Sequence, residues 1–245
     1  LNKDYTLYST VSGNANLKLE NWQPSGNIYL FIKRDIVSQI WTYGALPVQT
    51  EVVQTDPYEE KHIELVPDRV FGSTGNAEAQ LSAVRDIAIA ADGTIYVADS
   101  QNHRVQVFSP DGAFLRSWGA YGTVDSGNAP GGTFNEPWGI AVGPDGSVYV
   151  ADTWNHRIQK FSADGSFINT WGVPGLAEQP DQFWGPRGIA VDSDNRVYVT
   201  DTGNNRVVVF DAAGNFETQF GTNGINPGEF DEPVGIAVSG DGLVF

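Results

Sequence analysis

The sequence has 245 residues, of which 40% are hydrophobic and 18% are charged, a composition typical of a globular protein rather than a disordered one. Its 30 acidic and 14 basic residues give a formal net charge of −16, and the basic residues are scattered, so nucleic-acid binding is not expected. The absence of cysteine excludes disulfides, zinc–thiolate centres and a cysteine nucleophile. No apolar run reaches the roughly 20 residues of a membrane-spanning helix.

Residues 1–66 are predicted to form a small β-rich segment that ends in a polar, acidic linker. Residues 5–11 and 16–20 alternate between apolar and polar side chains, and residues 27–32 are almost all apolar. Both patterns are typical of strands. Residues 34–41 fit either a short helix or a further strand.

Residues 67–245 repeat one pattern. Its copies are 81–119, 134–172, 183–221 and the incomplete 230–245. Each full copy has four short apolar segments separated by turns, and Asp-Gly pairs such as Asp145-Gly146 supply the positive φ of tight hairpins. Four strands in about 40–50 residues are typical of a β-propeller blade. The sequence therefore predicts an all-β fold with three full four-stranded antiparallel blades and the start of a fourth, preceded by the β-rich segment.

The connection between the second and third segments of each copy carries a specific motif. It reads ADSQNHR at 98–104, ADTWNHR at 151–157 and TDTGNNR at 200–206. These residues resemble the signature of the NHL repeat, and the resemblance covers about residues 68–245. It implies a β-propeller, most often of six blades around a central channel, so we expect the closing blades to lie outside this sequence.

Residues 26–44 leave two interpretations open. The stretch GNIYLFIKRDIVSQIWTYG begins and ends like the repeat but lacks its middle, so it can be a shortened copy. Followed by NHL copies, it is also similar to the soluble tail of bacterial polytopic membrane proteins with a glycosyltransferase-like body (dolichyl-phosphate-mannose type). That similarity implies an extracytoplasmic, membrane-associated location, with the membrane reached only through sequence outside these 245 residues.

An acidic residue ends the second segment of each full copy and an arginine opens the third. The predicted pairs are Asp99–Arg104, Asp152–Arg157 and Asp201–Arg206. A ring of charges on one face of the propeller would be a functional site. Repetition in every copy instead favours a structural clamp across the hairpin, because a site needs to occur only once.

Histidine is not expected to bind metal. His103 and His156 share one repeat position, which Asn205 fills in the third copy, and a hydrogen-bonding turn residue tolerates that exchange whereas a metal ligand does not. The resemblance includes lyases with a histidine-bound metal in the channel, but these residues with His62 do not make that set. Residues 192–195 read as a hairpin turn rather than a calcium loop. We expect no metal, no cofactor and no catalytic residue in this chain.

Repeat positions that vary between copies are better candidates for binding. The position just before the first segment holds an arginine, a tryptophan or a valine, and it lies at the channel mouth if the first strand is innermost. The candidate binding residues are Arg85, Trp138, Trp154, Trp184 and Arg187. Aromatic rings beside arginine are typical of protein-binding hot spots and of sugar-stacking platforms. The alternative is that the rings pack between blades.

Three functions follow from these patterns. The first is a non-catalytic, extracytoplasmic propeller that binds a protein or a glycan within a larger membrane-associated protein. The second is an enzyme, either as the tail of a membrane glycosyltransferase or with a metal site in blades outside this sequence. The third, RNA binding, requires a basic face that a net charge of −16 disfavours.

Overall fold

The computed structural model describes residues 6–9, 15–18, 28–34, 37–43, 70–127 and 129–245. The chain divides into two units, Leu1–Glu64 and Leu65–Phe245. In the first unit, β1 (Thr6–Ser9) pairs with β2 (Ala15–Lys18), and β3 (Ile28–Arg34) pairs with β4 (Val37–Tyr43), both antiparallel. The stretch 34–41, for which helix and strand were both open, thus contains most of β4.

The second unit consists of four-stranded antiparallel sheets, which confirms the predicted propeller blades. Blade 1 comprises β7 (Val84–Ile89), β8 (Ile95–Asp99), β9 (Arg104–Phe108) and β10 (Phe114–Trp118). Blade 2 comprises β11 (Pro137–Val142), β12 (Val148–Asp152), β13 (Arg157–Phe161) and β14 (Phe167–Trp171). Blade 3 comprises β17 (Ile189–Val191), β18 (Val197–Asp201), β19 (Arg206–Phe210) and β20 (Phe216–Phe220). The described residues contain no α-helix.

The fourth copy supplies a short hairpin. Ala237 and Phe245 exchange backbone hydrogen bonds of 3.0 and 2.9 Å, and Val238 bridges Val244. Four described 3₁₀ turns accompany the blades: η1 (Ser100–Asn102), η2 (Val124–Ser126), η3 (Thr153–Asn155) and η4 (Thr202–Asn204).

The spacers that precede blade 1, blade 3 and the fourth copy close with short parallel pairings, and a single parallel bridge between Tyr121 and Phe134 closes the spacer before blade 2. The pairings are β5 (Ser73–Thr74) with β6 (Gln80–Leu81), β15 (Val173–Pro174) with β16 (Gln182–Phe183), and β21 (Thr222–Asn223) with β22 (Glu229–Phe230).

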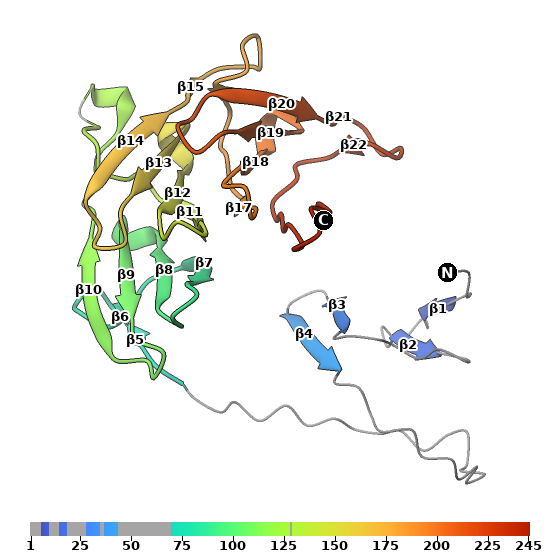
Figure 1. The fold of residues 1–245 in the computed structure, drawn as a ribbon, viewed down its shortest axis with the longest axis horizontal. Helices are drawn as coiled ribbons and strands as arrows, with labels where there is room; N and C mark the ends of the chain where they lie inside the picture. The colour runs from blue at the N-terminus through green and yellow to red at the C-terminus, as the bar shows by residue number, and fades with distance from the viewer. Residues whose placement is uncertain (1–5, 10–14, 19–27, 35–36, 44–69, 128) are drawn as a thin grey trace, which may run out of the picture. The chain divides into compact units, whose positions relative to one another are not determined.

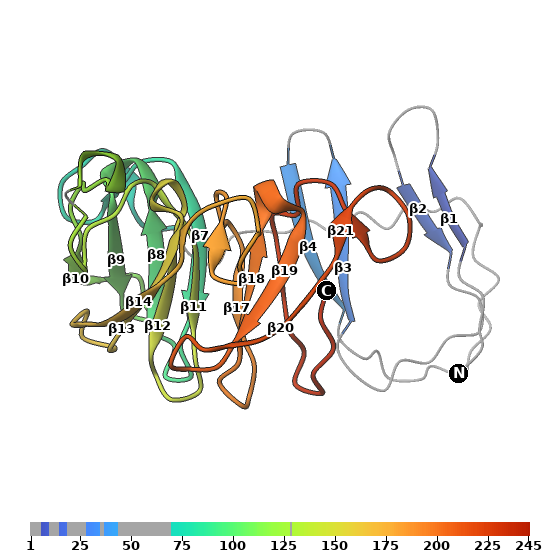
Figure 2. The same cartoon turned by 90° about the horizontal axis from the view of Figure 1, so that it is seen from above.

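The blades are arranged with their first strands innermost. Each sheet runs in sequence order, and Figure 1 shows β7, β11 and β17 along the inside of an arc with β10, β14 and β20 along the outside. In Figure 2 the strands of successive blades stand side by side. The channel side of the second unit is therefore formed by the first strand of each copy.

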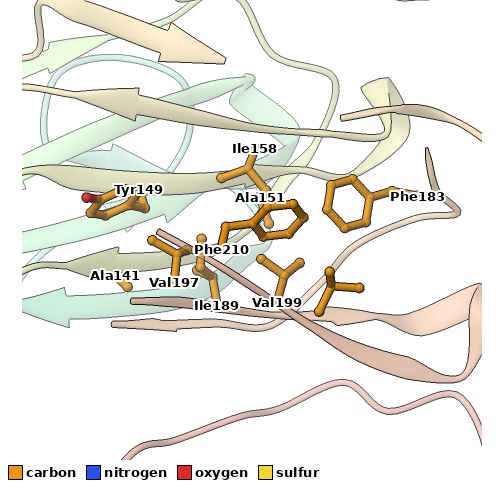
Figure 3. Close-up of a cluster of buried hydrophobic side chains, with 10 residues drawn as sticks. Ala141, Tyr149, Ala151, Ile158, Phe183, Ile189, Val197, Val199 and Phe210 are labelled. Carbon is orange, nitrogen blue, oxygen red and sulfur yellow. The ribbon is translucent and has the colours of Figure 1, made fainter. Parts of the chain in front are cut away.

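The hydrophobic core lies between blades, because a single four-stranded sheet would leave both faces in water. The cluster between blades 2 and 3, shown in Figure 3, joins Tyr149 and Ile158 to Phe183 and Phe210. Equivalent clusters lie between blades 1 and 2 and between blade 3 and the fourth copy. Burying one such side chain contributes about 1.5–3 kcal/mol. Trp118 and Trp171 pack against the edges of these clusters.

A buried carboxylate organises the hairpin of each blade. In blade 2 the Oδ2 atom of Asp152 accepts hydrogen bonds from Asn155 Nδ2 (2.9 Å), Arg157 Nε (2.8 Å) and Gln159 Nε2 (3.0 Å). Its Oδ1 atom accepts the backbone N–H of Asn135 at 2.7 Å. The same contact between arginine Nε and aspartate Oδ2 measures 2.7 Å in Asp99–Arg104 and 2.8 Å in Asp201–Arg206. All three aspartates are completely buried, so these donors replace the water that each carboxylate loses on folding.

The arginine of each pair also holds the spacer that precedes its blade. Arg157 donates to the backbone oxygens of Ala129 (2.7 Å) and Thr133 (2.8 Å), and Gln159 donates to Thr133 O at 2.7 Å. The clamp therefore fixes a hairpin and a loop that the sequence separates by more than 20 residues.

The shared histidine and asparagine position links neighbouring blades. His103, His156 and Asn205 all have left-handed φ values of 52°, 54° and 54°. The Nδ1 atom of His156 accepts the backbone N–H of Gly185 at 3.0 Å, while His103 Nδ1 and Asn205 Oδ1 accept the N–H of Glu136 (3.1 Å) and Glu232 (2.7 Å). Asparagine tolerates this backbone conformation and offers the same acceptor, which explains the exchange.

We predict that Asp152→Asn lowers the free energy of unfolding by about 3–5 kcal/mol, because it leaves the guanidinium of Arg157 buried without its counter-charge. Urea unfolding followed by circular dichroism measures the change. The control Asp194→Asn alters an exposed carboxylate 3.7 Å from Arg196 and should cost less than about 1 kcal/mol. Equal effects of the two substitutions would contradict the clamp.

We also predict a pH dependence from His156. Burial lowers the pKa of this imidazole below its usual value of 6.5. The unfolded chain then binds the proton more tightly, so stability falls as the pH drops from about 6.5 towards the folded-state pKa. His156→Asn keeps the acceptor for Gly185 and should reduce this loss in unfolding experiments between about pH 7 and pH 5. His156→Ala should cost about 1 kcal/mol even at neutral pH. An unchanged pH profile in His156→Asn would refute the assignment.

Candidate functional site

The five candidate binding residues lie at one end of the blades. The register pairs Val84 with Asp99 and Pro137 with Asp152, so each first strand begins where the second strand ends and η1 or η3 follows. In blade 3 the backbone N–H of Arg187 donates to Thr200 O at 3.1 Å. We call this end the η face, defined by the residues Arg85, Trp138, Trp154, Trp184 and Arg187.

Trp138 lies between two arginines from neighbouring blades. The guanidinium carbons of Arg85 and Arg187 lie 4.2 and 4.3 Å from the centroid of its ring. The two arginines come from the blades on either side of blade 2, because β11 contacts both β7 and β17. Trp138 is consequently not the open aromatic platform that the sequence suggested for sugar stacking, and it is not buried in an interblade core.

The two arginines lack acidic partners. Among the cationic side chains of residues 70–127 and 129–245, only Arg85 and Arg187 have neither a hydrogen bond nor an ion pair. The other cationic side chains bond to carboxylates or backbone oxygens: Arg104, Arg116, Arg157, Lys160, Arg196 and Arg206. The Nε atom of Arg187 and the Nε1 atom of Trp138 are buried donors without a partner. Other buried groups of the described residues share this feature, among them the indole N–H groups of Trp118 and Trp171, so the distinctive feature of this cluster is its two arginines without an acidic partner.

A cavity of about 160 Å³ opens beside this cluster, lined mainly by the first strands of the three blades and by Val234 and Ile236 of the fourth copy. Pockets for cofactors and drug-sized ligands usually measure about 300–1,000 Å³. The cavity between the described strands therefore matches a single side chain or a small ion better than a cofactor.

Asp86 also lines the cavity, and the sequence analysis missed it. Its Oδ1 atom accepts the backbone N–H of Ile87 at 2.9 Å, and its Oδ2 atom accepts that of Ile140 in blade 2 at 3.0 Å. Burial raises the pKa of this carboxyl above 3.8, while the two backbone bonds oppose the shift. The signal in the sequence was that the other three copies have glycine at this position.

The glycines at the same position explain why Asp86 is exceptional. A Cβ atom on Gly139 would lie 2.2 Å from Arg187 O, and one on Gly188 would lie 2.3 Å from Val234 O. The first strands of these neighbouring blades approach through their backbones, which leaves no space for a side chain. Only between blades 1 and 2 does a side chain occupy this position.

Trp154 and Trp184 are the most exposed aromatic rings of the η face, with 41% and 49% of their surfaces accessible. Trp154 donates from Nε1 to Glu136 Oε2 at 3.2 Å. Trp184 stacks on His156, with ring centroids 5.0 Å apart and an interplanar angle of 25°. It also covers Gly203, where a Cβ atom would lie 2.1 Å from the indole. Each ring is thus held in place while keeping much of its surface accessible.

Within the described residues, no group of three or more His, Asp or Glu side chains is arranged to hold a metal ion. No described helix is long and apolar enough to cross a membrane.

Comparisons with known proteins agree with the motif in the sequence. The NHL repeat model matches residues 82–108, 134–161 and 183–210. NHL repeat-containing protein 2 from Homo sapiens is 37% identical over 79 residues, 31% of this chain and 11% of that protein. Peptidyl-glycine alpha-amidating monooxygenase A from Xenopus laevis is 37% identical over 109 residues, 42% of this chain and 11% of that protein. The chain thus spans only a small part of these relatives.

Solved structures support the fold. A virginiamycin B lyase from Staphylococcus aureus superimposes with a TM-score of 0.50 at 18% identity, over 98% of this chain and 61% of that protein. At this identity the likeness concerns architecture alone. The repeated clamp, the blade topology and the matched family model converge: this chain carries three NHL repeats, folded as the blades of a β-propeller.

Proposed function

We propose that this NHL propeller is a non-catalytic module that binds a protein partner through its η face. The observation that carries the proposal is the pair of half-exposed tryptophans, Trp154 and Trp184, at the same end of the blades as the unpaired arginines. Tryptophan and arginine are enriched in protein-binding hot spots because they combine a large rigid surface with hydrogen-bond donors. The supporting contacts of Trp154 and Trp184 limit the entropy lost on binding.

The repeated polar residues support a binding role rather than catalysis. The aspartates and arginines of the NHL motif satisfy one another inside each hairpin, and the histidines accept backbone N–H groups between blades. These groups are therefore already engaged in holding the blades together. The residues that remain available are those at variable positions on the η face.

A protein partner is favoured over a glycan. A pyranose ring stacks on an open aromatic face, and guanidinium groups cover the ring of Trp138. Trp184 has His156 on one side. A protein segment can use the accessible surfaces and the polar atoms around them together.

We further propose that the module lies outside the cytoplasm, within a larger membrane-associated protein. The likeness of residues 26–44 to the tails of polytopic membrane proteins supports this location. Protease added to intact cells of the native host should degrade the domain while a cytoplasmic marker protein survives. Protection of the domain until the cells are lysed would contradict the location.

The binding role predicts that changes at the η face weaken partner recognition without unfolding the protein. Peptides selected from a displayed random library against the full chain provide the ligands. The double substitution Trp154→Gln and Trp184→Asn introduces the residues that blades 1 and 2 carry there, Gln101 and Asn135. We expect it to weaken binding of the selected peptides at least about tenfold, the loss of one hot spot.

Ile168→Gln is the matched control. It removes an exposed apolar side chain from the outer strand β14 and should leave peptide binding unchanged. Circular dichroism and thermal unfolding establish that all variants are folded. Selected peptides that bind the double variant as tightly as the unmodified chain would rule out the η face.

A further inference from the structure

We infer that Arg85, Trp138 and Arg187 form a carboxylate pocket, which takes an acidic side chain from a partner peptide. The inference rests on the proposed function, because it assigns the ligand chemistry of the same η face, but it has its own test. Its basis is the coincidence of two cations without acidic partners, one indole ring that both contact, and a small cavity beside them.

The charges in this cluster are uncompensated. Acidic residues outnumber basic ones 30 to 14, yet Arg85 and Arg187 contact an indole instead of a carboxylate. Cation–π contacts stabilise each guanidinium but leave its N–H groups without acceptors. A carboxylate from outside the chain would supply those acceptors, and hydrogen bonds between charged groups are the strong ones.

The arrangement of the donors favours a planar anion. Guanidinium groups are planar and bind carboxylates through two parallel N–H groups. Stacking on Trp138 holds both guanidiniums against the same ring, which fixes them before the ligand arrives. The Nε atom of Arg187 and the Nε1 atom of Trp138 are buried, so the terminal N–H groups of the guanidiniums are the donors that face a ligand.

The neighbouring carboxylate of Asp86 does not neutralise the arginines. Both of its oxygens accept backbone N–H groups, from Ile87 and Ile140, and it makes no ion pair with Arg85 or Arg187. Asp86 nevertheless places a negative group in the same cavity. It should repel an incoming anion, so neutralising Asp86 should strengthen anion binding, whereas neutralising the arginines should weaken it.

The cavity selects a single acidic side chain over larger anions. Its volume of about 160 Å³ is below the usual range for cofactors. Ile189, Val234 and Ile236 form apolar walls, which suit the methylene groups of a glutamate stem.

The experiment follows the indole N–H signals of the seven tryptophans by NMR in the full, ¹⁵N-labelled chain. Trp138→Phe assigns the signal of Trp138. A hexaglutamate peptide is the probe, and a hexaglutamine peptide is its uncharged control. We expect the Trp138 signal to shift saturably with hexaglutamate, to remain unchanged with hexaglutamine, and to move more than the signals of the core residues Trp118 and Trp171.

Three variants define the site. Arg85→Gln combined with Arg187→Gln should weaken hexaglutamate binding about tenfold or more, and Arg85→Gln alone should weaken it less. Asp86→Asn should strengthen binding. Arg116→Gln removes one positive charge from the outer strand β10 and should change nothing. Thermal unfolding establishes that each variant is folded.

The inference is overturned if hexaglutamate leaves the Trp138 signal in place, or if the double arginine variant binds as tightly as the unmodified chain. Tighter binding of trigalacturonate or inorganic phosphate than of hexaglutamate would also overturn it. Library peptides that require Trp154 and Trp184 but not the two arginines would leave the proposed function standing while this pocket fails. If hexaglutamate binding needs the arginines but the library peptides bind independently of the tryptophans, the pocket stands and the proposed function fails.

Discussion

The architecture of the propeller unit depends on one buried carboxylate in each blade. Asp152 loses its water on folding and regains four donors, which come from its own hairpin and from the loop before its blade. The chain can meet this demand only when the 3₁₀ turn, the third strand and the spacer adopt their positions together. Hairpin, loop and blade orientation are thereby coupled to a single charged group.

This coupling explains why the motif residues repeat while the functional candidates vary. Every blade needs the carboxylate and its arginine, so those positions are not free to serve a ligand. Position 138 and its equivalents lie on the channel side and take no part in the carboxylate–arginine clamp. These positions hold arginine, tryptophan, arginine and valine in the four copies, so the side-chain chemistry on the channel side differs from blade to blade.

Much of the fold could be predicted from the sequence, because the repeat records it several times. Asp-Gly turns, apolar segments and the Asp–Arg spacing each predict the same four-stranded meander, and the copies reinforce one another. The strand in residues 37–43 could not be distinguished from a helix, since a short apolar run has no decisive period.

The candidate site could be predicted only in part. The sequence placed Arg85, Trp138 and Arg187 in one repeat position, but their stacking depends on how far the blades rotate relative to each other, and local patterns do not encode that angle. Asp86 differs visibly from the glycine of the other three copies, but whether its side chain fits between two first strands depends on an interblade distance that the sequence does not give.

The backbone contact at Gly139 has a consequence for how such a protein changes over evolution. Where two inner strands touch through their main chains, a side chain at that position must push the two backbones apart, whereas the preceding residue carries the large indole of Trp138 without that contact. Adjacent residues of one strand are therefore constrained differently. The glycine maintains the spacing between neighbouring blades, whereas the residue before it can change and bind a different ligand without altering that spacing.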